Sequence, residues 1–478
     1  MALCGRSIVC LTAPRGNVAR LPLAFAVACA RAVGTLSRRL GKGGGTSAPG
    51  RVLLGVRPGA VGELAARLPD GTVMVSATNG KTTTSRLLGS CITAKGWSTV
   101  ANSAGANLFF GVATALLDPG IISGTTTFGV FEVDEFALPS VVDQVAPRVL
   151  LLMNVFRDQL DRYGELESIL DSWAQMISRL PTTTTLVLNA DDPAIAALDD
   201  GRHPVVWFGL DDPSVASAQM AHAADSTRCR RCAHDLGYAW STVGHMGEWA
   251  CPQCGAHRPS RDVSATRVEL LGVGAVRLEM RTPQGSISTQ VALPGLHNAY
   301  NVVAATAAAL ALGVEPEIIG AALAQADAAF GRAERVEIDG KSLVLLLAKN
   351  PAGANVTIQT VQLDPAPLHL LVSLNDRTAD GRDVSWIWDV DYEMLLPRIA
   401  HLTVTGDRAY ELALRFVYAG FPRERIQIEL GAEAALDSAL DALEGDGVLY
   451  VLPTYTAMLE LRSILVNRGA LRAYWEHV

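Results

Sequence analysis

The dominant pattern in this chain is an alternation of short apolar, β-branched runs with longer amphipathic segments. It begins after the glycine-rich stretch 41–50. Short runs of this kind predict buried strands, and the longer segments predict the helices that cover them. The expected strands are 72–76, 126–133, 148–154 and 184–189, and the expected helices start at Thr82 and span 165–180. Such an alternation is typical of a parallel α/β sheet.

The second half of the chain repeats this alternation after an interruption. Residues 225–260 are rich in Cys, His, Arg and Gly and have little periodicity, which indicates an inserted module. We expect the α/β pattern to resume after it, with an alanine-rich helix over 298–312. A further section opens near Phe330, with strand-like runs at 343–348, 368–374, 401–405, 425–429 and 448–452 and helical stretches at 408–418 and 432–443. This section predicts a second doubly wound unit of the Rossmann type.

These patterns divide the 478 residues into several units, since a chain of this length exceeds what one core usually supports. The expected units are an N-terminal helix with a glycine-rich linker over 1–50, a central α/β domain over 51–328 and a C-terminal Rossmann-like domain over 329–478. The insert 225–260 belongs to the central domain. A chain built in this way favours an enzyme over a lone binding module.

Composition excludes several classes of protein. The 48 acidic and 40 basic side chains, without a long basic run, lack the footprint of a nucleic-acid binder. The most apolar stretch, 21–36, is interrupted by Arg31 and is shorter than the roughly 20 residues of a membrane span. We interpret 1–39 as containing an amphipathic helix, because its scattered charges and lack of a cleavage site do not suit a signal sequence. The eight cysteines are too few for a disulfide scaffold, which favours a reducing cytoplasm.

The run SATNGKTTT, residues 76–84, lies between an apolar strand and a helix, where a phosphate-binding loop is expected. Backbone N–H groups and the helix dipole would face the phosphates of ATP, Lys81 would neutralise the outer phosphates, and Thr82 would ligate Mg²⁺. Val75 occupies the first glycine position of the full motif, so an ordinary helix cap is an equal alternative for this run alone. The residues expected to bind the nucleotide are Thr78, Asn79, Gly80, Lys81, Thr82 and Thr83.

Two later runs strengthen the nucleotide interpretation. The strand 126–133 ends in Glu132-Val133-Asp134-Glu135, and we expect Glu132 to complete the Mg²⁺ site with Thr82, although a solvated acidic loop is the alternative. The run LPGLHNAYN, residues 293–301, starts a helix at which His297, Asn298 and Asn301 would meet a nucleotide base. Simple helix capping by Asn298 is the alternative there.

The insert carries two cysteine knuckles, Cys229-x2-Cys232 and Cys251-x2-Cys254, which are separated by 18 residues. Four thiolates at this spacing saturate Zn²⁺ and leave no open position, so we expect a structural zinc ribbon. Unrelated or redox-active thiols are the alternative. Three nearby histidines are not needed as ligands, and we expect them at the surface: His234, His245 and His257.

Taken together, these runs resemble the Mur ligases, the ATP-dependent amide ligases of peptidoglycan assembly, and their folylpolyglutamate synthase relatives. The matching stretches are TNGKTT at 78–83, EVDE at 132–135, NVFRDQLDRYG at 154–164, LNADDP at 188–193, GLHNAYN at 295–301 and FGRAERVE at 330–337. The resemblance implies an ATPase domain over 51–328 that activates a carboxylate as an acyl phosphate, with Lys81 and Glu132 as catalytic residues.

The chain departs from this family at three places. Ala77 replaces a glycine of the phosphate loop. Gln159 replaces a histidine of the family, so the sequence does not predict whether a second metal site is present. The first part of the chain is too short for a UDP-sugar-binding domain, so a UDP-linked substrate is not expected.

The C-terminal section narrows the resemblance. The runs LLLAKNPAGAN at 345–355, LNDRTADGRDVSWIWDVDYE at 374–393 and YVLPTYTAMLELRSIL at 450–465 resemble the Mur-type ligase subunits that work with a glutamine amidotransferase of the GatD type. This resemblance implies a cytoplasmic heterodimer, acting at the inner membrane face where lipid II is made. It implies ATP-dependent amidation of the α-carboxyl of D-glutamate in lipid II to D-isoglutamine, with ammonia from the partner.

The sequence agrees with a separate source of ammonia. Outside the N-terminal helix and the insert its one cysteine is Cys91, which lies in an apolar helix unsuited to glutaminase chemistry. The resemblance also implies that an aspartate of the ligase completes the partner's Cys-His pair. Asp380, Asp383 and Asp389 are candidates, and we favour Asp383; helix or turn capping is as good an explanation for each. Two other functions stay open: an amino-acid-adding Mur or folylpolyglutamate-type ligase, and a non-catalytic nucleotide-binding scaffold.

Overall fold

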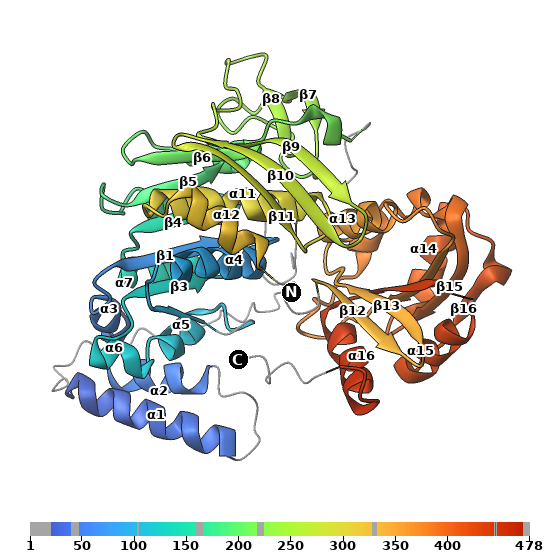
Figure 1. The fold of residues 1–478 in the computed structure, drawn as a ribbon, viewed down its shortest axis with the longest axis horizontal. Helices are drawn as coiled ribbons and strands as arrows, with labels where there is room; N and C mark the ends of the chain where they lie inside the picture. The colour runs from blue at the N-terminus through green and yellow to red at the C-terminus, as the bar shows by residue number, and fades with distance from the viewer. Residues whose placement is uncertain are drawn as a thin grey trace, which may run out of the picture.

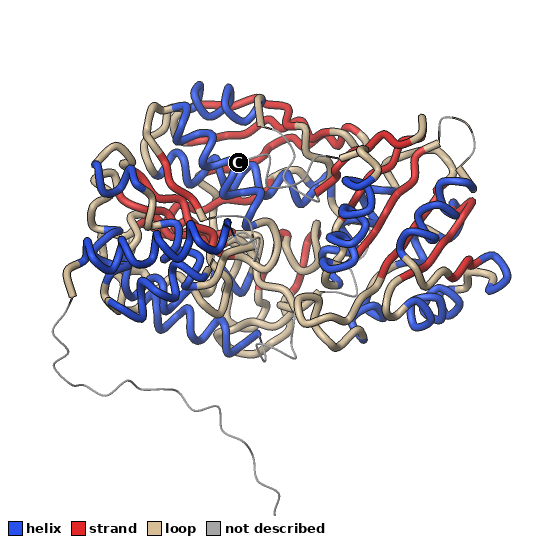
Figure 2. The backbone as a smooth tube through the Cα atoms, turned by 90° about the horizontal axis from the view of Figure 1, so that it is seen from below, coloured by secondary structure: helices blue, strands red, loops and turns tan. Residues whose placement is uncertain are grey.

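The computed structural model describes residues 21–39, 47–102, 105–157, 166–217, 224–326, 332–443, 445 and 447–471. These residues form two large sheets in separate lobes, each with helices on both faces (Figure 1, Figure 2). A third, two-stranded sheet belongs to the cysteine-containing insert, near the top of Figure 1. The expected α/β class is therefore confirmed.

The first sheet has nine strands in the order β11-β10-β9-β6-β5-β4-β1-β3-β2. The strands are β1 (Gly71–Ser76), β2 (Thr99–Ala101), β3 (Phe128–Glu132), β4 (Val149–Leu152), β5 (Thr185–Asn189), β6 (Val205–Leu210), β9 (Val263–Leu271), β10 (Ala275–Thr282) and β11 (Gly285–Val291). The stretch from β9 to β2 is parallel throughout. Successive residues of β1 face opposite cores, Val73 and Val75 one and Met74 the other, so apolar side chains are needed at every position.

Helices cover both faces of this sheet. One face carries α4 (Lys81–Ala94), α11 (Leu296–Ala311) and α12 (Pro316–Ala324). The other carries α3 (Ala60–Ala65), α7 (Leu138–Val145) and α9 (Leu166–Ile177). Two N-terminal helices lie near the β2 end of this sheet. They are α1 (Leu23–Arg39) and α2 (Ala48–Val56), and α2 packs against α5 (Phe109–Ala115) (Figure 1). Short turns of helix complete this lobe: α6 (Pro119–Ser123), α10 (Pro193–Ala196) and η1 (Pro213–Val215). Within the described residues, no helix has both the length and the apolar character that crossing a bilayer requires.

The α/β pattern expected to resume directly after the insert does so only from α11 onward. Strands β9, β10 and β11 form an antiparallel meander that extends the sheet. The reason lies in β10, where the buried Val276 and Leu278 alternate with the exposed Arg277 and Glu279. A period of two is the mark of a strand with one face in solvent, and antiparallel sheets tolerate this arrangement.

The second sheet has six strands in the order β12-β13-β17-β14-β15-β16. The strands are β12 (Arg332–Ile338), β13 (Lys341–Leu346), β14 (Leu368–Ser373), β15 (Ile399–Thr405), β16 (Ile426–Ile428) and β17 (Val448–Pro453). All neighbours are parallel except β12 and β13. One face packs on α13 (Pro351–Val361) and α14 (Ala409–Ala419), and the other on α15 (Ala432–Asp441) and α16 (Tyr455–Asn467). Short 3-10 turns occur in the loops: η2 (Ser385–Asp389), η3 (Tyr392–Met394), η4 (Leu396–Arg398) and η5 (Arg423–Arg425).

Candidate functional site

A cleft lies where the carboxyl edge of the nine-stranded sheet meets the second lobe, and its volume is about 860 Å³, part of which is open to solvent. The first lobe contributes Asn79, Gly80, Asn154, Phe156, Val243, Met246, Pro294, His297, Asn298, Tyr300 and Asn301. The second lobe contributes Leu346, Leu347, Lys349, Ala352, Gly353, Val356, Thr357 and Thr360. A concave, largely apolar pocket with a few polar groups at a lobe interface is the usual form of a small-molecule site.

The turn between β1 and α4 enters this cleft. Gly80 has a φ of 95°, and a Cβ atom there would lie 2.1 Å from Oδ1 of Asn301, so only glycine fits. The backbone N–H of Asn79 donates to Oδ1 of Asn154 at 3.0 Å, and Nδ2 of Asn154 donates to the Asn79 carbonyl at 3.0 Å. The Thr78 hydroxyl accepts the N–H of Phe156 at 3.0 Å. The loop is therefore held in one conformation by the segment that follows β4.

Lys81 is the first residue of α4, and its ammonium group is paired inside the protein. Nζ donates to Oε2 of Glu135 at 2.8 Å and to the carbonyl of Ala77, and the Lys81 and Glu135 side chains are each 10% exposed. Burial by itself raises the pKa of Glu135, but the positive charges of Lys81 and Lys349 outweigh this effect and hold the pKa below its ordinary value. Glu135 is thus ionised at neutral pH and holds Lys81 beside the loop.

The expected magnesium residues lie at the same edge of the sheet. Glu132 ends β3, is 4% exposed and lies in register with Val75 of β1. Asn102 fixes its backbone, with the Glu132 N–H donating to Oδ1 at 3.0 Å and Nδ2 donating to the Glu132 carbonyl at 2.9 Å. Thr82 is half-buried in the first turn of α4, and Thr83 beside it is buried. The pairing of Thr82 with Glu132 on a metal ion stays a prediction.

The start of α11 faces the loop, and the capping alternative for Asn298 is wrong because Gly295 occupies the N-cap position. Nδ2 of Asn298 donates to the Pro294 carbonyl at 2.7 Å, and its Oδ1 accepts Nδ2 of Asn301 at 2.9 Å. The Thr84 hydroxyl of α4 donates to Oδ1 of Asn301 at 3.3 Å. The structure therefore brings together the predicted residues Asn79, Gly80, His297, Asn298 and Asn301 around one cleft.

The second lobe contributes polar residues that the pattern of the sequence did not mark. Asn350 caps α13, with Oδ1 accepting the N–H of Gly353 at 2.7 Å. Its Nδ2 also donates to Oδ1 of Asn79 at 3.2 Å, across the lobe boundary. Lys349 beside it lines the cleft and acts on Glu135 through its charge. Glu135, Lys349 and Asn350 all lie within notable runs of the sequence, but none of them was expected to have a role in the site, although their position directly after strand-like runs was an available signal.

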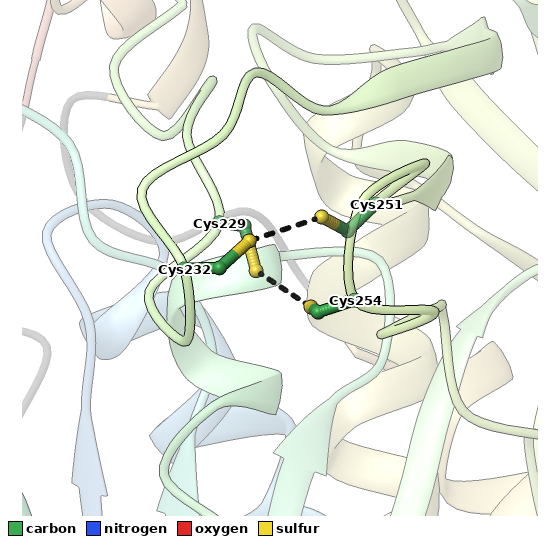
Figure 3. Close-up of side chains that lie close together, drawn as sticks. All are labelled: Cys229, Cys232, Cys251 and Cys254. Carbon is green, nitrogen blue, oxygen red and sulfur yellow. Dashed lines mark hydrogen bonds between the residues drawn. The ribbon is translucent and has the colours of Figure 1, made fainter.

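The four cysteines of the insert form one cluster (Figure 3). Their sulfur atoms all lie within 4.8 Å of one another, with 3.6 Å between Cys229 and Cys254 and 3.4 Å between Cys232 and Cys251. A tetrahedral site with Zn–S bonds of about 2.3 Å places its sulfurs about 3.8 Å apart, so the donor set and its spacing fit that ion. The cluster can hold a metal ion.

The expectation of surface histidines near the insert is confirmed for His234 and His257 but wrong for His245. His245 is 0% exposed, with Nε2 at 3.3 Å from Oδ2 of Asp192 and its ring centroid 4.6 Å from that of Phe156. The cause is the tip of the insert, which points into the core of the first lobe instead of into solvent.

The three aspartates of the run 374–393 differ in their surroundings. Asp380 is buried and accepts hydrogen bonds from the backbone and hydroxyl of Thr456, and burial raises its pKa above the ordinary value. Asp389 lies 3.1 Å from Nη1 of Arg157. Asp383 is exposed, and hydrogen bonds from Ser385 lower its pKa. Of the three, Asp383 is the most accessible to another protein. Gln159 lies outside the described residues.

Comparisons with known proteins identify the families that this chain resembles. Residues 75–248 match the Mur ligase middle domain, and residues 347–458 match the MurT ligase C-terminal domain. The chain is similar to the lipid II isoglutaminyl synthase (glutamine-hydrolyzing) subunit MurT of Streptococcus pneumoniae, with 34% identity over 91% of this chain and 95% of the relative. It is 30% identical to the subunit of the same name from Staphylococcus aureus, over 88% of this chain and 93% of the relative.

Among solved structures, a pseudomurein peptide ligase type C from Methanothermus fervidus has a TM-score of 0.67 and 19% identity. The similarity covers 85% of this chain and 80% of that ligase, which supports the Mur ligase fold. The identity and coverage shared with the two bacterial subunits go further: the chain belongs to the MurT family of Mur-type ligases.

Proposed function

We propose that this chain is the ATP-using ligase subunit of a lipid II isoglutaminyl synthase. ATP would phosphorylate the α-carboxyl of D-glutamate in the lipid II stem peptide, and ammonia would displace the phosphate to give D-isoglutamine. The observation that carries the proposal is the similarity to two MurT subunits over most of this chain and of theirs. The cleft between the lobes supports it, because five of the residues expected to bind ATP line it: Asn79, Gly80, His297, Asn298 and Asn301.

Within that proposal, each part of the cleft has a task. Residues 78–83 would hold the phosphates at the N-terminus of α4, and His297, Asn298 and Asn301 would meet the base. Glu135 balances the charge of the Lys81 ammonium group in the folded chain, and on ATP binding this ammonium group would neutralise phosphate charge. Mg²⁺, held by Thr82 and Glu132, would offset the charge of the transferred phosphoryl group. Lys349 adds a positive charge from the second lobe.

We assign the cysteine cluster to a structural Zn²⁺. All four ligand positions are taken by cysteine, so the ion would have no open site for catalysis. The division into 1–50, 51–328 and 329–478, with the ribbon at 225–260, is part of the same proposal. The residues next to the 328/329 boundary, 327–331, lie outside the described ones.

The ammonia would come from a GatD-like glutamine amidotransferase docked on the second lobe. Asp383 would complete the partner's Cys-His pair by orienting the imidazole.

The same region offers an exposed apolar surface, which we call the α14 face and which consists of Trp388, Tyr410, Leu414 and Tyr418. Trp388 and Tyr418 make an edge contact with ring centroids 5.5 Å apart. Exposed aromatic clusters of this kind often anchor protein partners. The pair would act in the cytoplasm, beside the membrane that holds lipid II.

The test mixes the purified chain, its partner, lipid II, glutamine and ATP, and follows the mass of the stem peptide. Amidation exchanges a hydroxyl for an amino group, and an unchanged mass with an active partner would overturn the proposal. Lys81→Ala separates the ligase from a nucleotide-binding scaffold. A ligase loses amidation outright in this variant, whereas a scaffold keeps the partner's assembly and glutaminase activity.

A further inference from the structure

The cysteine-containing insert reaches from the surface into the nucleotide cleft. Its hairpin, β7 (Gly237–Ser241) and β8 (Gly247–Ala250), has a cysteine knuckle before the first strand and another directly after the second. The two knuckles meet in the sulfur cluster (Figure 3). The tip at the other end, residues 242–246, enters the first lobe, where His245 is wholly buried. The metal ligands and the buried tip therefore belong to opposite ends of one short hairpin.

Two side chains of this tip form part of the cleft. Val243 and Met246 are 5% and 2% exposed and belong to the same core cluster as Phe156 and Tyr300. Both line the cleft. The second lobe completes the apolar lining with Leu346, Leu347, Ala352 and Val356. A planar base has two apolar faces and a polar edge, and a pocket that combines apolar side chains from both lobes with asparagines of α11 suits it.

A buried polar network fixes the tip against the rest of the lobe. The Thr242 hydroxyl lies 2.7 Å from the hydroxyl of Tyr300, which donates to Oδ2 of Asp191 at 2.7 Å. Nε of Arg258, just beyond the second knuckle, donates to Oδ1 of Asp191 at 2.8 Å. All of these groups are buried, so a shift of the hairpin would leave polar atoms unsatisfied.

We propose that Val243 and Met246 form the apolar wall that receives the nucleotide base, and that the metal-bound ribbon thereby sets the affinity for ATP. This inference rests on the proposed function. The chemistry agrees with it, because a methionine thioether makes favourable contacts with aromatic rings. A metal that joins the two strands at the open end of the hairpin restricts where the tip at the other end can lie.

The first test titrates the full chain with a non-hydrolysable ATP analogue by calorimetry. Met246→Ala removes the wall, and Met176→Ala is the matched control, since Met176 is 0% exposed but belongs to the core on the other face of the sheet. We expect Met246→Ala to bind the analogue about tenfold more weakly and the control to bind it unchanged. Val243→Ala, a smaller change, is expected to have a weaker effect of the same sign.

Equal affinity of Met246→Ala and the unaltered chain would overturn the inference and leave the proposed function intact. If the unaltered chain fails to bind the analogue at all, the proposed function falls, and the inference falls with it. Unfolding midpoints of the two methionine variants show whether lost affinity is a packing effect, because both delete a buried side chain.

The second test removes the metal with a chelator and follows released zinc and analogue binding in the same sample. Affinity is expected to fall in step with the zinc released and to return when Zn²⁺ is added back. Thr242→Val gives an independent route, because it breaks the contact with Tyr300 and leaves the cysteines in place. Unchanged affinity in both the zinc-free chain and Thr242→Val would show that the ribbon does not act on the cleft.

Discussion

At the scale of single residues, the site is organised around an ion pair. Lys81 and Glu135 are nearly buried and contact each other at 2.8 Å. Removal of one partner from such a pair leaves the other charge without compensation in a poorly hydrated place. The Mur-type lysine is thus part of the folded structure before any nucleotide arrives.

This arrangement predicts a pH-dependent stability. The pKa of Glu135 is lower in the folded chain than its ordinary value. The ionised Glu135 side chain therefore adds to the free energy of unfolding above the unfolded carboxyl pKa of about 4.3. The contribution is lost as the pH falls through the folded pKa. Urea unfolding of Glu135→Gln should show a loss of about 3 kcal/mol at neutral pH and a shrinking difference from the unaltered chain in acid.

Glu315→Gln is the matched control, because Glu315 pairs with Lys95 at the surface, where its side chain is 52% exposed. Exposed pairs contribute little, so this variant should unfold almost like the unaltered chain. A loss for Glu135→Gln that stays constant down to acid pH would contradict the ion-pair explanation.

At the scale of elements, α14 shows an unusual outer face. Tyr410, Leu414 and Tyr418 recur at helical spacing and are 64%, 49% and 73% exposed, while the opposite side of the helix packs Leu412 and Phe416 into the core. A helix that is apolar on both sides has a second surface to cover. Its neighbour η2 carries Trp388 and follows Asp383.

Leu414→Ala should therefore weaken binding of the proposed amidotransferase partner by about tenfold while ATP-analogue binding by the isolated chain stays unchanged. Leu430→Ala is the control, because Leu430 is an exposed leucine of the same lobe that does not belong to the α14 face. The partner is immobilised on a surface, and each variant of the ligase chain is titrated over it. This measurement gives the dissociation constants of the Leu414→Ala and Leu430→Ala variants. Equal constants for the two variants would place the partner elsewhere.

The elements were predictable where the chain has one clear period. The buried runs of β1, β4 and β5 lie within two residues of expectation, and the amphipathic α9 ends three residues before the expected position 180. The meander β9–β11 was missed because the interruption before it hid a period of two. His245 was wrongly predicted to lie at the surface for a related reason. The composition of a loop does not show that its tip is buried by residues far away in the chain, such as Phe156.

At the scale of the whole molecule, the cleft belongs to neither lobe alone. Asn79 of the first lobe and Asn350 of the second are 271 residues apart in the chain and bonded at the cleft. The sequence identified the residues of the first lobe because they follow known loop chemistry. It did not place Lys349 and Asn350, because the docking of two lobes depends on contacts that no local pattern encodes.

Asn350→Ala tests that junction. It should lower stability by about 1 kcal/mol through the lost cap on α13 and, in addition, raise the KM for ATP several-fold through the lost bond to Asn79. Asp118→Ala removes a comparable cap, on α6, far from the cleft. Thermal unfolding and ATP-dependent amidation with the partner separate the two effects, and an equal KM in both variants would show that the junction is unimportant for ATP.

The Lys81–Glu135 pair has a consequence for how the enzyme meets its nucleotide. An exposed lysine must shed its water and its salt counter-ions when a triphosphate binds, so its attraction weakens as ionic strength rises. Lys81 has already lost that hydration in the folded chain and exchanges one anionic neighbour for another. The contribution of Lys81 to nucleotide binding should therefore depend less on salt concentration than that of an exposed lysine.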